Sequence, residues 1–422
     1  FAERNSLINT ENAFKVGPHI VHVERQTREV IKLNLGEPDF AVPNHIKDEI
    51  KRQLDLENTN YCDPKGLLSL REAISLQINQ TRGLQRSPEH VVVFPGGKPS
   101  IGLAQQVYCD PGDEVIYPSP GFPIYESYIR YVGAVPVPLY LEEKANFTFS
   151  PNELETKITP KTKLIYLNFP SNPTGSVATL KQLEEYAEVI LENCRTDIRI
   201  YSDEIYENII FDGKKHHSIS SIKEISSKTI IASGFSKTFS WTGGRIGYAI
   251  FPTVEEADIF KNMNINYFSC VPPYNQEAAR EALENPLSKK AVQKMVDTFE
   301  LRRNLIWDQI SKIPGIRCKK PGGAFYLFPN ISEGCENLDL IKKHQKLPLE
   351  EQSSPANLFQ MFSLYEHGVA LLDRSSFGKI GSDGKHFLRL SIAAEKSVLE
   401  EGVRRIKAAL EDFSGLNKFL KK

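Results

Sequence analysis

The segment from Thr229 to Ile250, TIIASGFSKTFSWTGGRIGYAI, constrains the fold more than any other part of the chain. It begins with apolar and β-branched residues and no polar alternation, which is typical of a strand buried on both faces. Lys237 follows this strand, where partial loss of hydration lowers the pKa of an amine and makes it a nucleophile. Arg245 stands eight positions later among three glycines, which let backbone N–H groups approach a phosphate. The segment therefore indicates an aldehyde cofactor that carries a phosphate.

The segment also permits two other interpretations. A single lysine on a loop is more often a surface residue, and the GGxxG spacing resembles the turn of a dinucleotide-binding fold. The glycines do not directly follow a strand, however, and the full glycine spacing of that turn is missing. We therefore do not expect a nicotinamide-dependent oxidoreductase.

Polar side chains stand at the ends of three predicted strands in a strand–helix series. Asn172 comes after the strand in KLIYLNF, Asp203 ends the strand in DIRIYSD, and Lys237 follows the strand described above. Alone, NPTG would be a turn and Asp203 a helix N-cap. In open parallel sheets, however, ligands bind at the carboxyl edge, where all three residues would lie. We infer a cofactor site at that edge.

A second phosphate-binding element is predicted in VVVFPGGKPSIGLAQQVYC, which reads as a strand, a Gly-Gly turn and a helix from about Lys98 to Tyr108. The N-terminus of a helix offers unpaired N–H groups and a partial positive charge, which suit a phosphate. Gly97 and Lys98 are the candidate residues. Without the other motifs, this stretch would be an ordinary strand–turn–helix.

The run S-K-T-F-S-x-T-G-x-R-I-G-Y resembles the cofactor-lysine segment of class I aminotransferases, which are fold-type I pyridoxal phosphate enzymes of the aspartate aminotransferase kind. The runs L-G-E-P-D-F, N-P-T-G, S-D-E-I-Y and F-x-R-x-S-x-A follow the order of that family. The resemblance implies an α/β fold with a large domain, built on a mainly parallel sheet between helices, and a small α+β domain. Residues 1–44 would form an N-terminal arm and part of the small domain, 45–285 the large cofactor-binding domain, and 286–422 the rest of the small domain.

The resemblance also implies roles at the cofactor. Lys237 would form a Schiff base with pyridoxal phosphate and move a proton, and Arg245 would hold the phosphate. Asp203 would keep the pyridine nitrogen protonated, which makes the ring an electron sink. Asn172 and Tyr206 would donate to the phenolate oxygen. No metal site is predicted.

Further roles concern the substrate and a partner subunit. Phe122 would stack on the pyridine ring, although core packing is the default for such a residue. Arg389, inside the apolar strand HFLRLSIA, would bind the substrate α-carboxylate together with Gly36 and Asn172, and a structural salt bridge is the alternative. Tyr61 would reach across a homodimer interface to the neighbouring phosphate, unless it merely packs beside a loop.

The chain departs from the family pattern at three places. The hydroxyl residue usually found three positions before the lysine is Gly234, so Ser236 or backbone N–H groups would replace it at the phosphate. The usual P-G-S-x-F-G turn reads DRSSFG over residues 373–378, whose added charges could alter the pocket wall. The stretch 330–355 is longer and more charged than the usual connection, and we expect a solvated surface excursion.

The predicted reaction is transfer of an amino group from an L-amino acid to a 2-oxo acid. A β-lyase or a cyclising γ-elimination on the same apparatus is the alternative, because the motifs serve the cofactor and do not identify the substrate side chain. A non-catalytic regulatory domain would need a DNA-binding module, for which residues 1–30 leave no room.

Composition narrows the partners. The formal net charge of −1 gives no reason to expect a nucleic acid partner, and no apolar run is long enough to span a membrane. The first residues, FAERNSLINTEN, lack the apolar core of a signal peptide. Six cysteines are scattered without disulfide or metal spacing, as in reduced cytosolic proteins, so we expect a cytoplasmic homodimer.

Overall fold

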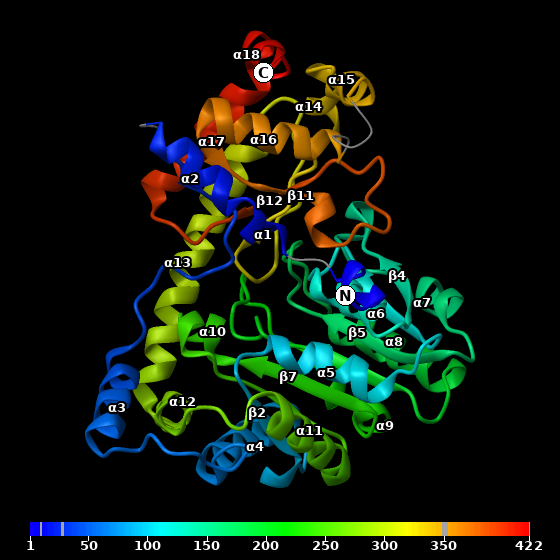
Figure 1. Cartoon of the computed structure of the whole chain (residues 1–422), viewed down its shortest axis with the longest axis vertical. Helices are drawn as coiled ribbons and strands as arrows, with labels where there is room; N and C mark the ends of the chain where they lie inside the picture. Colours follow the sequence, from blue (N-terminus) through cyan, green and yellow to red (C-terminus); the bar gives the residue numbers. More distant parts are fainter. Residues whose placement is uncertain (9–10, 27–28, 348–352, 422) are drawn as a thin grey trace.

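The computed structural model describes residues 1–422 except 9–10, 27–28, 348–352 and 422. At its centre lies a seven-stranded sheet (Figure 1). Strand β8 pairs antiparallel with both neighbours, whereas the other pairs are parallel, so the mainly parallel sheet is confirmed. In spatial order the strands are β2 (Val91–Phe94), β8 (Gly247–Ile250), β7 (Thr229–Gly234), β6 (Arg199–Asp203), β5 (Thr162–Asn168), β3 (Glu114–Ser119) and β4 (Val135–Tyr140).

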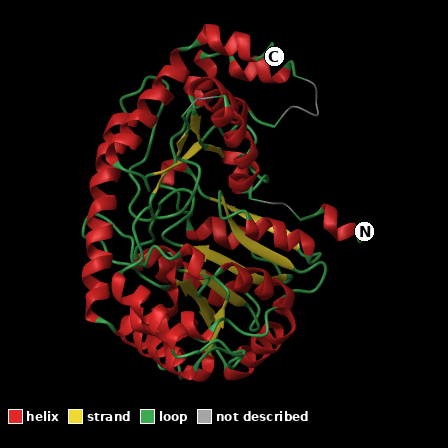
Figure 2. Ribbon diagram, turned by 60° about the vertical axis from the view of Figure 1, so that its left-hand side comes forward, coloured by secondary structure: helices red, strands yellow, loops and turns green. Residues whose placement is uncertain are grey.

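Helices cover both faces of this sheet because its strands are apolar on both sides (Figure 2). One face packs against α5 (Lys98–Tyr108), α6 (Ile124–Tyr131) and α11 (Val254–Tyr267). The other face packs against α4 (Leu68–Arg82), α8 (Leu180–Asn193) and α12 (Pro273–Glu284). The predicted bounds of α5 are confirmed. The helices α3 (Asn44–Asp55), α7 (Pro151–Lys157), α9 (Lys223–Ser226) and α10 (Phe235–Thr238) complete this part.

A second layer is built around the long helix α13 (Pro286–Ile310), whose apolar stripe is buried at Met295, Phe299, Ile306 and Ile310. It contains the antiparallel sheet β11-β12-β9 and the pair β1-β10. Because β1 comes from the N-terminal part of the chain, both ends contribute to this layer. The domain limits at 44/45 and 285/286 stay predictions. The elements are α1 (Asn12–Lys15), α2 (Gly17–Arg25), β1 (Ile31–Lys32), β9 (Tyr326–Leu327), α14 (Ser332–Asn337), α15 (Leu340–Gln345), α16 (Pro355–His367), β10 (Val369–Ala370), β11 (Leu372–Asp373), β12 (Leu388–Ser391), α17 (Lys396–Glu411) and α18 (Phe413–Phe419).

The prediction of a solvated excursion at 330–355 is wrong for residues 331–340, whereas residues 341–347 are exposed or partly buried. Ile331, Cys335, Leu338 and Leu340 are fully buried in the same core as α13 and α17. The first three are four and three residues apart, so they form one stripe along α14, and the charges between them conceal this helical period. Residues 348–352 lie outside the described residues.

Within the described residues, the helices are too short or too polar to cross a bilayer.

Candidate active site

A cavity of about 590 Å³ opens where β5, β6 and β7 end and α5 begins. This volume is within the range of small-molecule sites. The structure brings nearly all of the predicted site residues to this cavity. They are Gly36, Gly97, Lys98, Phe122, Asn172, Asp203, Tyr206, Ser236, Lys237, Arg245 and Arg389.

Lys237 lies in the single turn α10, directly after β7, at the carboxyl edge of the sheet. Its Nζ donates a hydrogen bond to the carbonyl oxygen of Gly36 at 2.6 Å. Burial, together with the nearby positive charge of Arg389, lowers the pKa of the Lys237 amine to about 8. The amine is therefore available as a nucleophile near neutral pH.

Asp203 ends β6 and is 7% exposed. Its Oδ2 accepts a hydrogen bond from the Tyr125 hydroxyl at 2.6 Å, and its backbone carbonyl accepts one from Asn168 Nδ2 at 3.1 Å. Burial raises the pKa of the Asp203 carboxyl to about 6, against the lowering effect of the Tyr125 hydrogen bond. None of the described residues places a cation beside this buried carboxylate, which is therefore suited to a cationic ring nitrogen. The sequence interpretation missed Tyr125, whose signal was only its place three residues after Phe122.

Arg389 in β12 is 4% exposed and is therefore a buried cation. Its Nη1 donates to Asn172 Oδ1 at 3.0 Å and its Nη2 to the Asn34 carbonyl at 2.6 Å. The rings of Tyr326 and Phe377 lie 4.5 and 4.9 Å from the guanidinium carbon. No ion pair joins Arg389 to a carboxylate of the described residues, and its Nε has no hydrogen-bond partner there. Since an unpaired buried charge is costly, this guanidinium is suited to an anion entering the cavity.

A cradle for a second anion lies at the N-terminus of α5. A Cβ on Gly96 would stand 2.0 Å from Arg245 Nη2, and one on Gly247 would stand 2.4 Å from the carbonyl carbon of Gly96. Glycines are thus required for the close approach of these strands and the arginine. Arg245 Nη1 donates to the Thr242 carbonyl at 2.8 Å, and Ser236 lines the same cavity.

Lys98 stands at the first position of α5, but its side chain takes a different direction from the cradle. Its Nζ pairs with the carboxylate of Glu11, from the N-terminal arm. What Lys98 offers to an anion at the helix N-terminus is therefore its backbone N–H.

The hydroxyl groups of Tyr206 and Tyr326 are hydrogen-bonded at 2.7 Å. Burial raises the pKa of Tyr206 well above its ordinary value, so it remains a donor. Gly36 lies against Tyr326, since a Cβ there would stand 2.2 Å from the Tyr326 oxygen. Tyr326 was missed in the sequence, where GGAFYLF indicates only a strand.

The altered turn at 373–378 keeps its charges out of the cavity. Arg374 is buried and donates to Ser119 Oγ and the Gly378 carbonyl, both at 2.8 Å. Burial lowers its pKa to about 10. Ser376 and Phe377 form the cavity wall, so the concern that added charges alter the wall is not supported.

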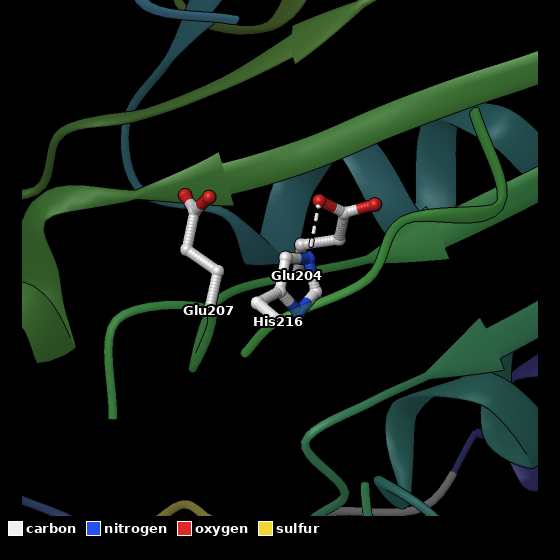
Figure 3. Close-up of side chains that lie close together, drawn as sticks. All are labelled: Glu204, Glu207 and His216. Carbon is white, nitrogen blue, oxygen red and sulfur yellow. Dashed lines mark hydrogen bonds and ion pairs between the residues drawn. The ribbon is translucent and has the colours of Figure 1, made fainter. Parts of the chain in front are cut away.

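A cluster that follows Asp203 in the sequence contains Glu204, Glu207 and His216, whose ligand-type atoms lie within 4.8 Å of one another (Figure 3). His216 Nε2 contacts Glu204 Oε2 at 2.9 Å, and Arg82 pairs with both carboxylates. Burial alone would raise the pKa of Glu204, but Arg82 and His216 together lower it. Because the guanidinium already neutralises the carboxylates, we interpret the cluster as a structural ion-pair network.

Tyr61 does not line the cavity and is 88% exposed. A single chain does not test a role in a partner subunit, and that role stays a prediction.

The chain resembles known proteins over nearly its full length. The sequence pattern of the family described as "Aminotransferase class I and II" matches residues 28–406. A probable aspartate/prephenate aminotransferase of Aquifex aeolicus is 37% identical, covering 91% of this chain and 92% of the relative. An aromatic-amino-acid aminotransferase of Thermococcus litoralis is 35% identical over the same shares of both chains. The solved aspartate aminotransferase of Rhizobium meliloti has a TM-score of 0.87 and 28% identity, covering 97% of this chain and 98% of that one.

Proposed function

Since the chain belongs to the class I and II aminotransferase family, we propose that the cavity around Lys237 is its active site and that Lys237 carries the cofactor. The chain is a fold-type I aminotransferase that depends on pyridoxal phosphate, and the predictions of fold, cofactor and amino-group transfer are confirmed. The relatives do not favour the β-lyase or γ-elimination alternative. The roles of individual residues are the part that we propose.

The cavity residues fit pyridoxal phosphate. The glycine-lined cradle of Arg245, Gly97 and the α5 N-terminus suits the phosphate. Asn172 and Tyr206 line the cavity and would hold the phenolate oxygen, and Phe122 would cover the ring.

One observation carries the proposal: a lysine of lowered pKa, a buried carboxylate and a buried unpaired arginine line the same cavity. Lys237 is suited to an aldehyde, Asp203 to a ring N–H⁺, and Arg389 to a carboxylate. These three requirements coincide in an amino acid bound beside a pyridoxal phosphate.

The reaction divides among these groups. When bound, pyridoxal phosphate supplies an aldehyde and an electron-withdrawing ring. Arg389 holds the α-carboxylate so that the Cα–H bond points toward Lys237. The Lys237 amine, set free when the amino acid takes its place on the cofactor, would accept the proton from the substrate Cα and give it up again as a general acid. Asp203 holds the proton on the ring nitrogen, and Tyr206 donates to the phenolate oxygen. A 2-oxo acid leaves, and a second oxo acid reverses these steps.

Two further statements are proposals. A homodimer is supported by the exposed Tyr61 and by the match of its sequence context to the family. A cytoplasmic location is supported by the six cysteines, which are all free.

The test is a panel of amino donors and oxo-acid acceptors, with cofactor absorbance and product identity as readouts. We expect each active donor to yield its 2-oxo acid and to convert the cofactor to its amine form. Release of ammonia with a substrate side chain eliminated would contradict transamination.

A further inference from the structure

We propose that Glu11, from the N-terminal arm, sets the side-chain selectivity of this aminotransferase by neutralising Lys98. The cavity would thereby favour amino acids with uncharged, largely apolar side chains and discriminate against acidic ones. This inference rests on the proposed function and names its substrate class. The similar proteins include aspartate and aromatic aminotransferases, so their names do not choose between these classes.

Glu11 and Lys98 both line the cavity, although they are distant in the sequence. The Glu11 carboxylate contacts Lys98 Nζ, and the Glu11 side chain is 16% exposed. Glu11 directly precedes α1, where Asn12 Nδ2 donates to Ser376 Oγ at 3.0 Å. The arm is therefore fixed to the cavity wall, and the carboxylate is held in place rather than being free in solvent.

The charges of the cavity lining show which charge the Glu11–Lys98 pair presents to a substrate side chain. The cations that line the cavity are Lys98, Lys237, Arg245 and Arg389. The last three have functions toward the cofactor and the α-carboxylate. Among the described residues of that lining, Lys98 is the cation left over, and Glu11 cancels its charge.

The surroundings of the pair are apolar and aromatic. Lys98 Nζ lies 5.6 Å from the ring centroid of Phe122 and 5.9 Å from that of Phe14. Leu35, Leu372 and Phe377 also line the cavity. An uncharged side chain would cover the ion pair and bury its own apolar surface against these groups.

An acidic side chain meets a different situation. It must either lie beside the Glu11 carboxylate, where like charges repel, or displace Glu11 from Lys98 and leave that carboxylate unpaired. The selectivity thus arises because the Glu11 carboxylate repels acidic substrates. We expect a discrimination of about tenfold or more, since two like charges about 4 Å apart in a partly buried site repel each other by more than the equivalent of a factor of ten.

The experiment compares aspartate with asparagine, which are nearly equal in size, and includes phenylalanine. The holoenzyme is mixed with each donor alone, and the half-reaction is followed by cofactor absorbance, so no dicarboxylic acceptor is present. In the wild type we expect phenylalanine and asparagine to react with higher specificity constants than aspartate. Glu11→Gln should raise the aspartate-to-asparagine ratio at least about tenfold.

Two variants separate this role from others. Glu37→Gln removes another carboxylate of the cavity lining, which accepts a hydrogen bond from Thr242 rather than pairing with Lys98, and should leave the ratio within about twofold. Adding Lys98→Met to Glu11→Gln should abolish the gain for aspartate, because the freed cation is what binds the acid.

The outcomes are distinct. The inference is overturned if aspartate is the best wild-type donor, or if Glu11→Gln leaves the ratio unchanged. It is also overturned if Glu37→Gln raises the ratio equally, or if the double variant keeps the gain. If no amino acid converts the cofactor at all, the proposed function itself fails.

Discussion

Replacing Arg389 by lysine keeps a positive charge in β12 but removes the planar group that the site is built around. The guanidinium lies between the rings of Tyr326 and Phe377 and donates to Asn172 and the Asn34 carbonyl. A lysine cannot donate in two parallel directions or stack in that slot. We therefore expect Arg389→Lys to lose most of its transaminase activity.

The size of the loss follows from the burial of the contact. Truncating one partner of a buried, charge-assisted pair costs about 2–5 kcal/mol. Since 1.4 kcal/mol is a factor of ten, the half-reaction with an amino acid should slow by roughly 30-fold to 4,000-fold. The lower end applies if the ammonium still reaches the substrate carboxylate through one hydrogen bond.

Single-turnover kinetics with an amino acid and its decarboxylated amine provide the assay. The amine has no carboxylate, so the wild type and Arg389→Lys should convert it equally slowly. A variant that slows the amine as much as the amino acid would show that Arg389 is structural, and the placement of the α-carboxylate would be wrong. Unchanged cofactor absorbance in the variant serves as the control for an intact site.

Three other perturbations test separate parts of the structure. The pKa of Asp203 in the folded apoenzyme is raised to about 6, so its contribution to stability is complete below about pH 4 and is lost as the pH rises through 6. Relative to Asp203→Asn, the wild-type apoprotein should lose about 3 kcal/mol of unfolding free energy over this pH window, measured by urea unfolding. Parallel curves of unfolding free energy against pH for the two proteins would refute the raised pKa. Arg82→Met leaves the buried carboxylates of Glu204 and Glu207 without their cation and should cost about 3–5 kcal/mol in unfolding free energy, whereas a loss below 1 kcal/mol would mean that the network is not needed. Sedimentation should show a dimer, and Tyr61→Phe should weaken cofactor retention more than thermal stability; a fully active monomer would disprove the shared site.

Much of the site was predictable because parallel strands bring their ends together. Asn172, Asp203 and Lys237 each follow an apolar run, and the topology of the sheet places them at one edge of the cavity. Local sequence alone was enough to locate each strand end. That the three strand ends lie close together then follows from the general geometry of parallel sheets.

Contacts between distant segments were not predictable in the same way. Tyr206 meets Tyr326 across 120 positions, and Glu11 meets Lys98 across 87. Neither Tyr326 nor Glu11 carries a local pattern that marks a site, because the small layer and the arm reach the cavity only after folding. The helix α14 was missed for another reason, since its buried stripe is interrupted by charged residues.

The identity of the lysine that carries the cofactor tests the central claim most directly. The holoenzyme is treated with borohydride, digested, and analysed by mass spectrometry for peptides that carry the reduced pyridoxyl group. The position of Lys237 after β7, with its pKa lowered to about 8, predicts the group on Lys237 and its absence from a Lys237→Ala variant. Attachment to Lys98, the other lysine that lines the same cavity, would contradict the assignment of the active site.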